Sequence, residues 1–356
     1  MRGKIFSTTI ILTIFLVFLF VSACPNLQNK YAIDNLPGCD DCPFELDEEI
    51  LAELVNRIEI GDYGNIHSLI IIHNDSLVME EYFMGWTRDM LHYCFSATKS
   101  VISALIGIAI DQGKVGGLEE KLLSFFPEYD DISNLDERKE SITLEHVLTM
   151  SSGFTWTPMD SEEDMAKSSD WIKYVLDLPM SDEPGTQFVY NSGGSHLLSG
   201  IITNKTGQSA EEFAEENLFN KLGINNWEWE SDPRGITIGG WGLELYPVDM
   251  AMFCYLYLKN GSLNGKQIVP EDWVEESTIR HMPSYGYQWW RFFDFMVEDH
   301  PEAESIFYAM GLGGQWIFII PNFNMVVVTT AENLESYASS AYDFLFDYIL
   351  PAVKEK

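Results

Sequence analysis

The chain has 356 residues, of which 46% are hydrophobic and 13% aromatic, enough for one large core with an inserted subdomain. Its formal net charge is −34 at pH 7, from 55 acidic and 21 basic side chains. Such a surface repels nucleic-acid phosphates and anionic lipid headgroups. We therefore expect no nucleic-acid partner, and any attachment to a membrane requires an anchor.

Residues 1–23 resemble an export signal. Arg2 and Lys4 give a basic start, an apolar stretch follows, and residues 21–24 (Val-Ser-Ala-Cys) are similar to the box of bacterial lipoproteins. The resemblance implies cleavage before Cys24, lipid attachment to that cysteine, and a protein anchored in the cell envelope. An ordinary secretory signal and an uncleaved membrane anchor are the alternatives, since the apolar stretch is near the lower limit for a membrane span.

Residues 24–48 are acidic and rich in Pro and Asn, which is typical of a tether. Cys39 and Cys42 have the spacing of a redox motif or of half a zinc site, but no second pair completes a zinc site. In an exported chain we expect a disulfide between them. Cys94 and Cys254 have apolar neighbours and are expected to be buried thiols.

The folded domain is expected to run from residue 49 to the C-terminus. Apolar residues at helical spacing predict a helix over 49–58. Residues 66–73 are apolar and β-branched, and Asn-Asp-Ser separates them from a second segment over 77–83. This pattern predicts a hairpin.

A serine and a lysine follow, where an aromatic strand end enters an apolar helix. Ser96 and Lys99 are three residues apart, so they share one helix face. A serine hydroxyl needs a base to act as a nucleophile, and a lysine desolvated at a buried helix start has a lowered pKa and can take the proton. A capping serine with a solvated lysine is the simpler alternative, which the apolar flanks disfavour. The pair therefore indicates catalysis.

Residues 112–245 are predicted to form a helical insertion. Thr143 caps a short helix, a second helix runs over 195–206, and Ser209 opens a capping box with the glutamate three residues on. After the insertion, Pro247 begins a helix that ends at Leu258.

Tyr190, followed by Asn191 and Ser192, precedes the second of these helices. Beside a lysine ammonium, a tyrosine can share or lose its proton and act as the base on a serine. Taken by itself, the residue fits a buried tyrosine that hydrogen-bonds a backbone carbonyl better than it fits a catalytic base.

Beyond residue 285 the pattern predicts strands over 285–291, 315–320 and 325–330 and a final helix over 335–350. Strands at both ends of the chain imply one antiparallel sheet built from distant segments. The expected fold class is α/β (α+β): an antiparallel sheet flanked by helices, with an inserted all-helical subdomain.

Three segments together carry a resemblance to a known family. Ser96-Ala97-Thr98-Lys99, then Tyr190-Asn191-Ser192, then Gly311-Leu312-Gly313-Gly314-Gln315 resemble the serine beta-lactamase and penicillin-binding protein superfamily, in its class C-like branch. That branch includes class C beta-lactamases, D-alanyl-D-alanine carboxypeptidases, family VIII-type esterases and 6-aminohexanoate-dimer hydrolase. The resemblance covers residue 50 to the C-terminus and implies the beta-lactamase-like fold.

The resemblance also implies roles for individual residues. Ser96 would be the acylated nucleophile, Lys99 would hold or relay its proton, and Tyr190 would be the general base in acylation. Ser192 would hydrogen-bond Lys99 or the substrate. The oxyanion hole would use the N–H of Ser96 and one from the glycine-rich segment, with Leu312 favoured over Gly313 and Gly314. No metal and no organic cofactor is implied.

The chain departs from the family pattern at one strand. Members that recognise penicillin usually carry Lys-Thr-Gly or His-x-Gly there, whereas residues 306–315 contain neither lysine nor histidine. The triplet Lys205-Thr206-Gly207 has the same letters as the family motif, but it ends a helix and lies on no strand. A cation at the strand position binds a substrate carboxylate, so its absence favours uncharged esters or amides. Arg291 is an alternative anchor.

The sequence therefore predicts a serine hydrolase that acts through an acyl-enzyme on carboxylic esters or small amides. A D,D-peptidase or beta-lactamase acting on cell-wall peptides or beta-lactams is the enzymatic alternative. A non-catalytic receptor for peptidoglycan fragments or a protein is the alternative from another class. The seven histidines do not cluster at metal-binding spacing, and the oligomeric state is open.

Overall fold

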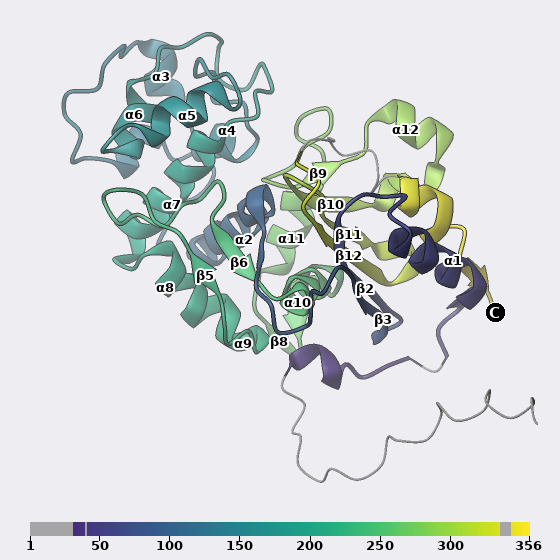
Figure 1. The fold of residues 1–356 in the computed structure, drawn as a ribbon. Helices are drawn as coiled ribbons and strands as arrows, with labels where there is room; N and C mark the ends of the chain where they lie inside the picture. Colours follow the sequence, from purple (N-terminus) through teal and green to yellow (C-terminus); the bar gives the residue numbers. More distant parts are fainter. Residues whose placement is uncertain (1–30, 40, 335–342) are drawn as a thin grey trace, which may run out of the picture. The chain divides into compact units, whose positions relative to one another are not determined.

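The computed structural model describes residues 31–39, 41–334 and 343–356, so the predicted signal and Cys24 lie outside the described residues. All elements below belong to the compact unit formed by residues 31–356 (Figure 1). The main sheet, within the described residues, has six antiparallel strands in the order β3-β2-β12-β11-β10-β9. Their bounds are β2 (Ile66–His73), β3 (Ser76–Tyr82), β9 (Trp290–Arg291), β10 (Phe307–Gly311), β11 (Gln315–Ile320) and β12 (Met325–Ala331).

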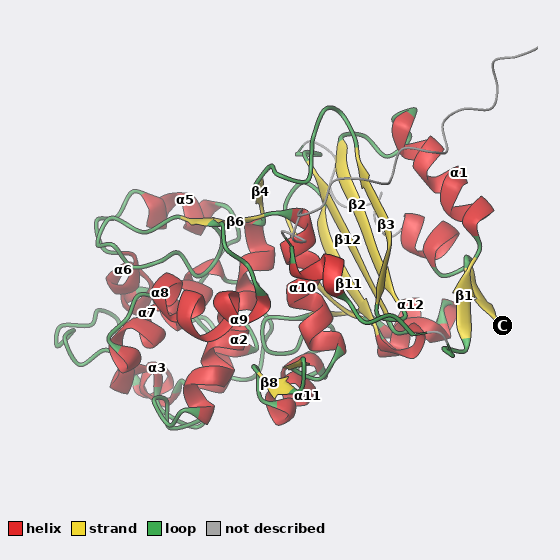
Figure 2. Cartoon of the chain, turned by 90° about the horizontal axis from the view of Figure 1, so that it is seen from below, coloured by secondary structure: helices red, strands yellow, loops and turns green. Residues whose placement is uncertain are grey.

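Alternating apolar residues give the sheet two buried faces, as the pleat of a strand requires. Ile70 and Val326 on one face join the core under α10 (Pro247–Leu258), which packs on β2, β11 and β12. Ile71 and Val327 on the other face join a second core with α1 (Glu48–Glu59). Figure 2 shows the sheet between these helices. The predicted fold class, an antiparallel sheet flanked by helices, is therefore confirmed.

Helix α2 (Thr98–Asp111) lies between the sheet and the helical region and contacts both β10 and α7. Nearly all its residues are buried, which explains why it is apolar on every side. The helical region comprises 3₁₀ turn Leu122–Phe125, α3 (Glu137–Ser141), α4 (Leu144–Leu148), α5 (Asp160–Ala166), α6 (Trp171–Asp177), α7 (Ser192–Thr206), α8 (Ala210–Ala214), π-helical Glu215–Phe219 and α9 (Asn220–Leu222).

Smaller elements complete the unit. A minor antiparallel sheet joins β4, β6 and β5. The bounds are 3₁₀ turn Ala32–Asn35, β1 (Phe44–Leu46), β4 (His92–Tyr93), 3₁₀ turn Phe95–Ala97, β5 (Glu228–Trp229), β6 (Leu243–Leu245), β7 (Ser262–Leu263), β8 (Lys266–Gln267), α11 (Glu271–Thr278), α12 (Asp294–Asp299), 3₁₀ turns Pro301–Ser305 and Pro321–Phe323, π-helical Leu345–Ile349 and β13 (Val353–Glu355).

Several local predictions match the structure. The 49–58 helix, the hairpin and the helix from Pro247 to Leu258 form as expected. Thr143 caps α4, and Ser209 forms its capping box with Glu212. Cys39 and Cys42 form the predicted disulfide, and the thiols of Cys94 and Cys254 are buried.

Three expectations need correction. Residues 31–48 do not form a simple tether, because Ile33 is buried in the core and β1 pairs with β13. The strand expected over 285–291 shortens to β9, because the backbone turns at Gln288, whose φ is +63°. Strand β10 lies between β9 and β11, where the residue pattern predicted no separate strand. The first part of the final predicted helix, 335–342, lies outside the described residues.

The described ranges contain no helix that is long and apolar enough to cross a bilayer. They also contain no group of three or more His, Cys, Asp or Glu side chains placed to hold a metal ion.

Candidate active site

Ser96 lies in the 3₁₀ turn that joins β4 to α2. Its side chain is partly exposed, while the neighbouring Ala97 is buried. The preceding Phe95 has φ +46°, a left-handed conformation that costs an aromatic residue free energy. The surrounding fold therefore holds Ser96 in a strained turn with its hydroxyl accessible, an arrangement that is common at active sites.

Lys99 is one helical turn further on and is buried, with 1% of its surface exposed. Its Nζ lies 3.0 Å from Oγ of Ser96 and donates to the carbonyl of Gly240 at 2.7 Å. Burial lowers the pKa of Lys99 to about 7, against a smaller opposing effect from the Glu162 carboxylate. A neutral amine fits both contacts, because it can donate to Gly240 and accept the proton of Ser96.

Tyr190 precedes α7 and meets this pair. The Nζ of Lys99 lies 4.9 Å from the centroid of the Tyr190 ring, and Trp290 stacks on that ring at 5.3 Å. Burial raises the pKa of the Tyr190 phenol, although a hydrogen bond with the Ser96 side chain acts in the opposite direction. Near neutral pH the phenol is thus protonated, and Lys99 rather than Tyr190 is the group that loses its proton.

Ser192 was expected to hydrogen-bond Lys99 or the substrate, and the contacts of Lys99 bear only on the first of these. Within the described chain, Lys99 bonds to Ser96 and Gly240 and makes no hydrogen bond to Ser192. Ser192 is buried at the first position of α7 and packs against Gly240, where an added Cβ would lie 3.0 Å from the Ser192 carbonyl oxygen. Gly240 was not among the predicted site residues, and the Gly239-Gly240 pair is the only signal for it in the sequence.

The glycine-rich segment forms the turn between β10 and β11. An added Cβ on Gly311 would lie 2.3 Å from the carbonyl oxygen of Cys94, so the backbone of β10 passes close to the turn that carries Ser96. Gly313 and Gly314 have φ of +81° and +106° and neighbour residues 331–334 instead. Of the three candidates, Leu312 directly follows the close contact at Gly311. The use of its N–H in the oxyanion hole stays a prediction.

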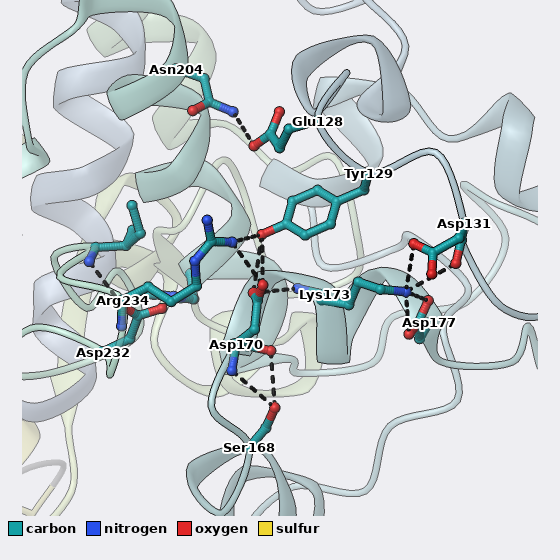
Figure 3. A network of polar contacts seen from close by, with 12 residues as sticks. Glu128, Tyr129, Asp131, Ser168, Asp170, Lys173, Asp177, Asn204, Asp232 and Arg234 are labelled. Carbon is teal, nitrogen blue, oxygen red and sulfur yellow. Dashed lines mark hydrogen bonds and ion pairs between the residues drawn. The ribbon is translucent and has the colours of Figure 1, made fainter.

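A buried chain of polar contacts supports the loop that supplies Gly240. Nε2 of His196 lies 3.2 Å from Oδ2 of Asp232, and the N–H of Gly239 donates to Nδ1 of His196 at 3.4 Å. Arg234, in the same loop, pairs with Asp170 at 2.7 Å. Figure 3 shows Arg234 and Tyr129 meeting at the Asp170 carboxylate. The acceptor of Lys99 is therefore held by groups that are distant in sequence.

Gln288 ties together three of the helices around the site. Its Nε2 donates to the carbonyl of Leu148 at 2.8 Å, and its Oε1 accepts from Ser195 at 2.7 Å. Its backbone carbonyl accepts from Ser100 at 2.7 Å. These bonds link α4, α7 and α2, and so fix the helices next to Tyr190 and Lys99 relative to each other.

The alternative anchor, Arg291, is occupied by the protein itself. Its guanidinium donates to the backbone carbonyls of Thr278, at 3.0 Å, and of Glu304. A substrate carboxylate would have to displace these bonds. Lys205 pairs with Glu120 at the end of α7 and lies away from the main sheet.

An antiparallel sheet backed by α2, with Ser96, Lys99 and Tyr190 together at its edge, is the architecture of the serine beta-lactamase and penicillin-binding protein superfamily. The family described as Beta-lactamase matches residues 67–350, and the chain belongs to that family.

Relatives within the superfamily have several activities. A 6-aminohexanoate-dimer hydrolase of Paenarthrobacter ureafaciens is 22% identical over 293 residues, covering 73% of this chain and 71% of its own. A solved family VIII carboxylesterase has a TM-score of 0.64 at 12% identity, covering 85% and 95% of the two chains. A penicillin-binding protein of Bacillus halodurans has a TM-score of 0.61 at 18% identity, covering 82% and 97%. The two solved structures establish the shared fold.

Proposed function

We propose that this hydrolase acts on carboxylic esters or small amides through an acyl-enzyme on Ser96. The observation that carries the proposal is the 3.0 Å contact between Oγ of Ser96 and the buried Nζ of Lys99, whose pKa is about 7. An accessible hydroxyl beside an amine that is partly neutral at physiological pH has what nucleophilic catalysis requires.

The reaction follows from this geometry. Neutral Lys99 takes the proton of Ser96 as Oγ bonds to the substrate carbonyl carbon, and the oxyanion accepts hydrogen bonds from the N–H groups of Ser96 and Leu312. The Lys99 proton then passes through the Tyr190 hydroxyl to the leaving alcohol or amine as the carbon–heteroatom bond breaks. Water then attacks the acyl-enzyme and gives a proton through the Tyr190 hydroxyl to Lys99. As the bond between the acyl carbon and Oγ breaks, Lys99 returns this proton to Oγ of Ser96 and the acid is released.

Esters and small amides are favoured over beta-lactams for two reasons. Residues 306–315 carry no lysine or histidine to bind a substrate carboxylate, and Arg291 is bonded to backbone carbonyls. A solved family VIII carboxylesterase has the same fold, and a 6-aminohexanoate-dimer hydrolase is a relative by sequence. Hydrolysis of a chromogenic cephalosporin as fast as of a simple ester would overturn this preference.

The direct test is intact-mass spectrometry of the purified full chain after exposure to a fluorophosphonate probe. We expect one adduct, which disappears in Ser96→Ala and persists in Ser103→Ala, because Ser103 is a buried serine of the same helix. An unlabelled, folded wild-type chain would refute the hydrolase mechanism and favour a receptor.

For localisation, we propose an exported protein anchored through a lipid on Cys24. The disulfide between Cys39 and Cys42 supports this, because such bonds persist in oxidising compartments. We expect radiolabelled palmitate to enter the wild-type chain but not Cys24→Ala. Equal labelling of both would exclude the anchor.

A further inference from the structure

A cavity of about 450 Å³ opens beside the candidate nucleophile. Tyr93, Phe95, Glu162 and Trp241 line it, and we call it the acidic pocket. Phe95 directly precedes Ser96, and Trp241 directly follows Gly240, the acceptor of Lys99. A group bound in this pocket is therefore next to the reacting serine, so the pocket is placed to hold part of the substrate.

The lining of the acidic pocket combines aromatic rings with one carboxylate. Tyr93 and Phe95 pack edge to face at 4.6 Å, and Trp241 is partly exposed. Glu162 is half-buried on α5, and its carboxylate has no hydrogen bond or ion pair with the rest of the described chain. Neither lysine nor arginine lines the pocket.

The charge of Glu162 extends into the candidate site. The carboxylate raises the pKa of Lys99, against the larger lowering by burial, and it also raises that of Tyr190. The hydroxyl of Tyr93 donates to a further carboxylate, that of Glu230, at 2.6 Å. The pocket thus has a negative potential, in a protein whose net charge is −34.

We propose that the acidic pocket binds an ammonium group of the substrate, so that this hydrolase prefers cationic esters or amides to neutral and anionic ones. Aromatic faces attract a cation through their quadrupoles, and a free carboxylate adds a charge-assisted contact. The inference deepens the proposed function, because it names a substrate class for the same site.

The other substrate charges fit less well. A neutral alkyl group would pack on the rings but would take water from Glu162 without replacing its hydrogen bonds. A carboxylate would meet a like charge with no cation nearby to offset it. Of the three kinds of group, only a cation interacts favourably with both the aromatic rings and the carboxylate of Glu162.

The test compares three inhibitors of p-nitrophenyl butyrate hydrolysis by the full chain: benzyltrimethylammonium, benzyl alcohol and benzoate. We expect the inhibition constant of the cation to be about tenfold below that of the alcohol, with benzoate the weakest. Equal constants for the cation and the alcohol would overturn the proposal.

Glu162→Gln should remove most of the preference for the cation over the alcohol. Glu163→Gln is the matched control, since it removes the same charge one residue along, from an exposed side chain paired with Lys167 at 3.0 Å. Glu163→Gln should leave the ratio of the two inhibition constants unchanged. If both substitutions change this ratio equally, the net charge of the protein, and not the pocket, causes the preference for the cation.

The experiments distinguish a failure of the pocket proposal from a failure of the hydrolase proposal. If Ser96 is labelled and the ester is hydrolysed but the cation binds no better than the alcohol, the pocket inference fails and the hydrolase stands. If Ser96 is not labelled, calorimetric titration of the chain with benzyltrimethylammonium still decides the pocket. Saturable binding lost in Glu162→Gln supports the inference, and its absence overturns it.

Discussion

Two regions close to Ser96 differ in charge. The end of β10 and the turn at Leu312 present no charged side chain, whereas the acidic pocket presents Glu162. Members of the superfamily that recognise penicillin are expected to carry a cation on the strand that corresponds to β10. Under our proposal, the charge that selects the substrate of this chain lies in the helical region and is negative.

The packing of the two regions explains why a charge is easier to place in one than in the other. Ala309 is 1% exposed within the main core, and the backbone of Gly311 touches Cys94, so a lysine there would pay a large desolvation cost. Glu162 lies on a short helix at the surface of the helical region and keeps contact with water.

The largest expected effect comes from Lys99, the proposed base on Ser96. Lys99→Met should lower kcat/KM for p-nitrophenyl butyrate about 100- to 10,000-fold, because the base is removed. It should also raise the melting temperature at pH 7 and below, because the wild type must bury an ammonium there. A variant as active as the wild type would contradict the role of Lys99.

The buried amine of Lys99 also predicts how the free energy of unfolding changes with pH. The pKa of Lys99 falls from 10.5 to about 7 on folding, so the unfolded chain binds more protons between these values. The stability of the wild type should therefore rise relative to Lys99→Met as the pH increases from 7 to 10.5. Denaturant unfolding across this range measures the difference.

A smaller effect is expected at Gln288, which joins α4, α7 and α2 around the candidate site. Gln288→Ala removes buried hydrogen bonds and should lower the free energy of unfolding by about 2–4 kcal/mol. Gln288→Gly loses the same bonds but tolerates φ +63°, so it should be about 1 kcal/mol more stable than the alanine variant. Equal stability of the two would show that the left-handed conformation is not retained.

A lysine in the turn after β10 would test whether this turn and the acidic pocket select ligands of opposite charge. Leu312 is 40% exposed, so Leu312→Lys should be tolerated and should strengthen benzoate inhibition about threefold while weakening that by benzyltrimethylammonium. Ile60→Lys adds the same charge at an exposed site on another part of the fold and should change neither constant. If both variants change the inhibition constants equally, net charge and not the position of the lysine explains the change.

The smallest effect is a shift in the pH profile. Because the carboxylate of Glu162 raises the pKa of Lys99, Glu162→Gln should move the acid limb of kcat/KM for a neutral ester to lower pH. Glu163→Gln should leave that limb in place. An acid limb that stays in place in Glu162→Gln would show that the carboxylate does not act on Lys99.

Sequence reasoning was most successful where the signal was local. The spacing of Ser96 and Lys99, the hairpin, and the capped helices all depend on residues within a few positions of each other. It failed at 285–291, where alternating aromatic residues resembled one strand. There the contact of Gln288 with the distant Leu148 turns the backbone, and no local pattern reports such a contact.

The sequence by itself determined the elements, the turn that exposes a serine one helical turn from a lysine, and the resemblance that placed Tyr190 beside them. Only the tertiary structure decided that Gly240 accepts from Lys99, that Lys99 rather than Tyr190 titrates near neutrality, and that Glu162 faces the site. The physical reason is that periodicity and capping are fixed by neighbours along the chain. Burial, and the pKa values and pockets that follow from it, depend on segments that only folding brings together.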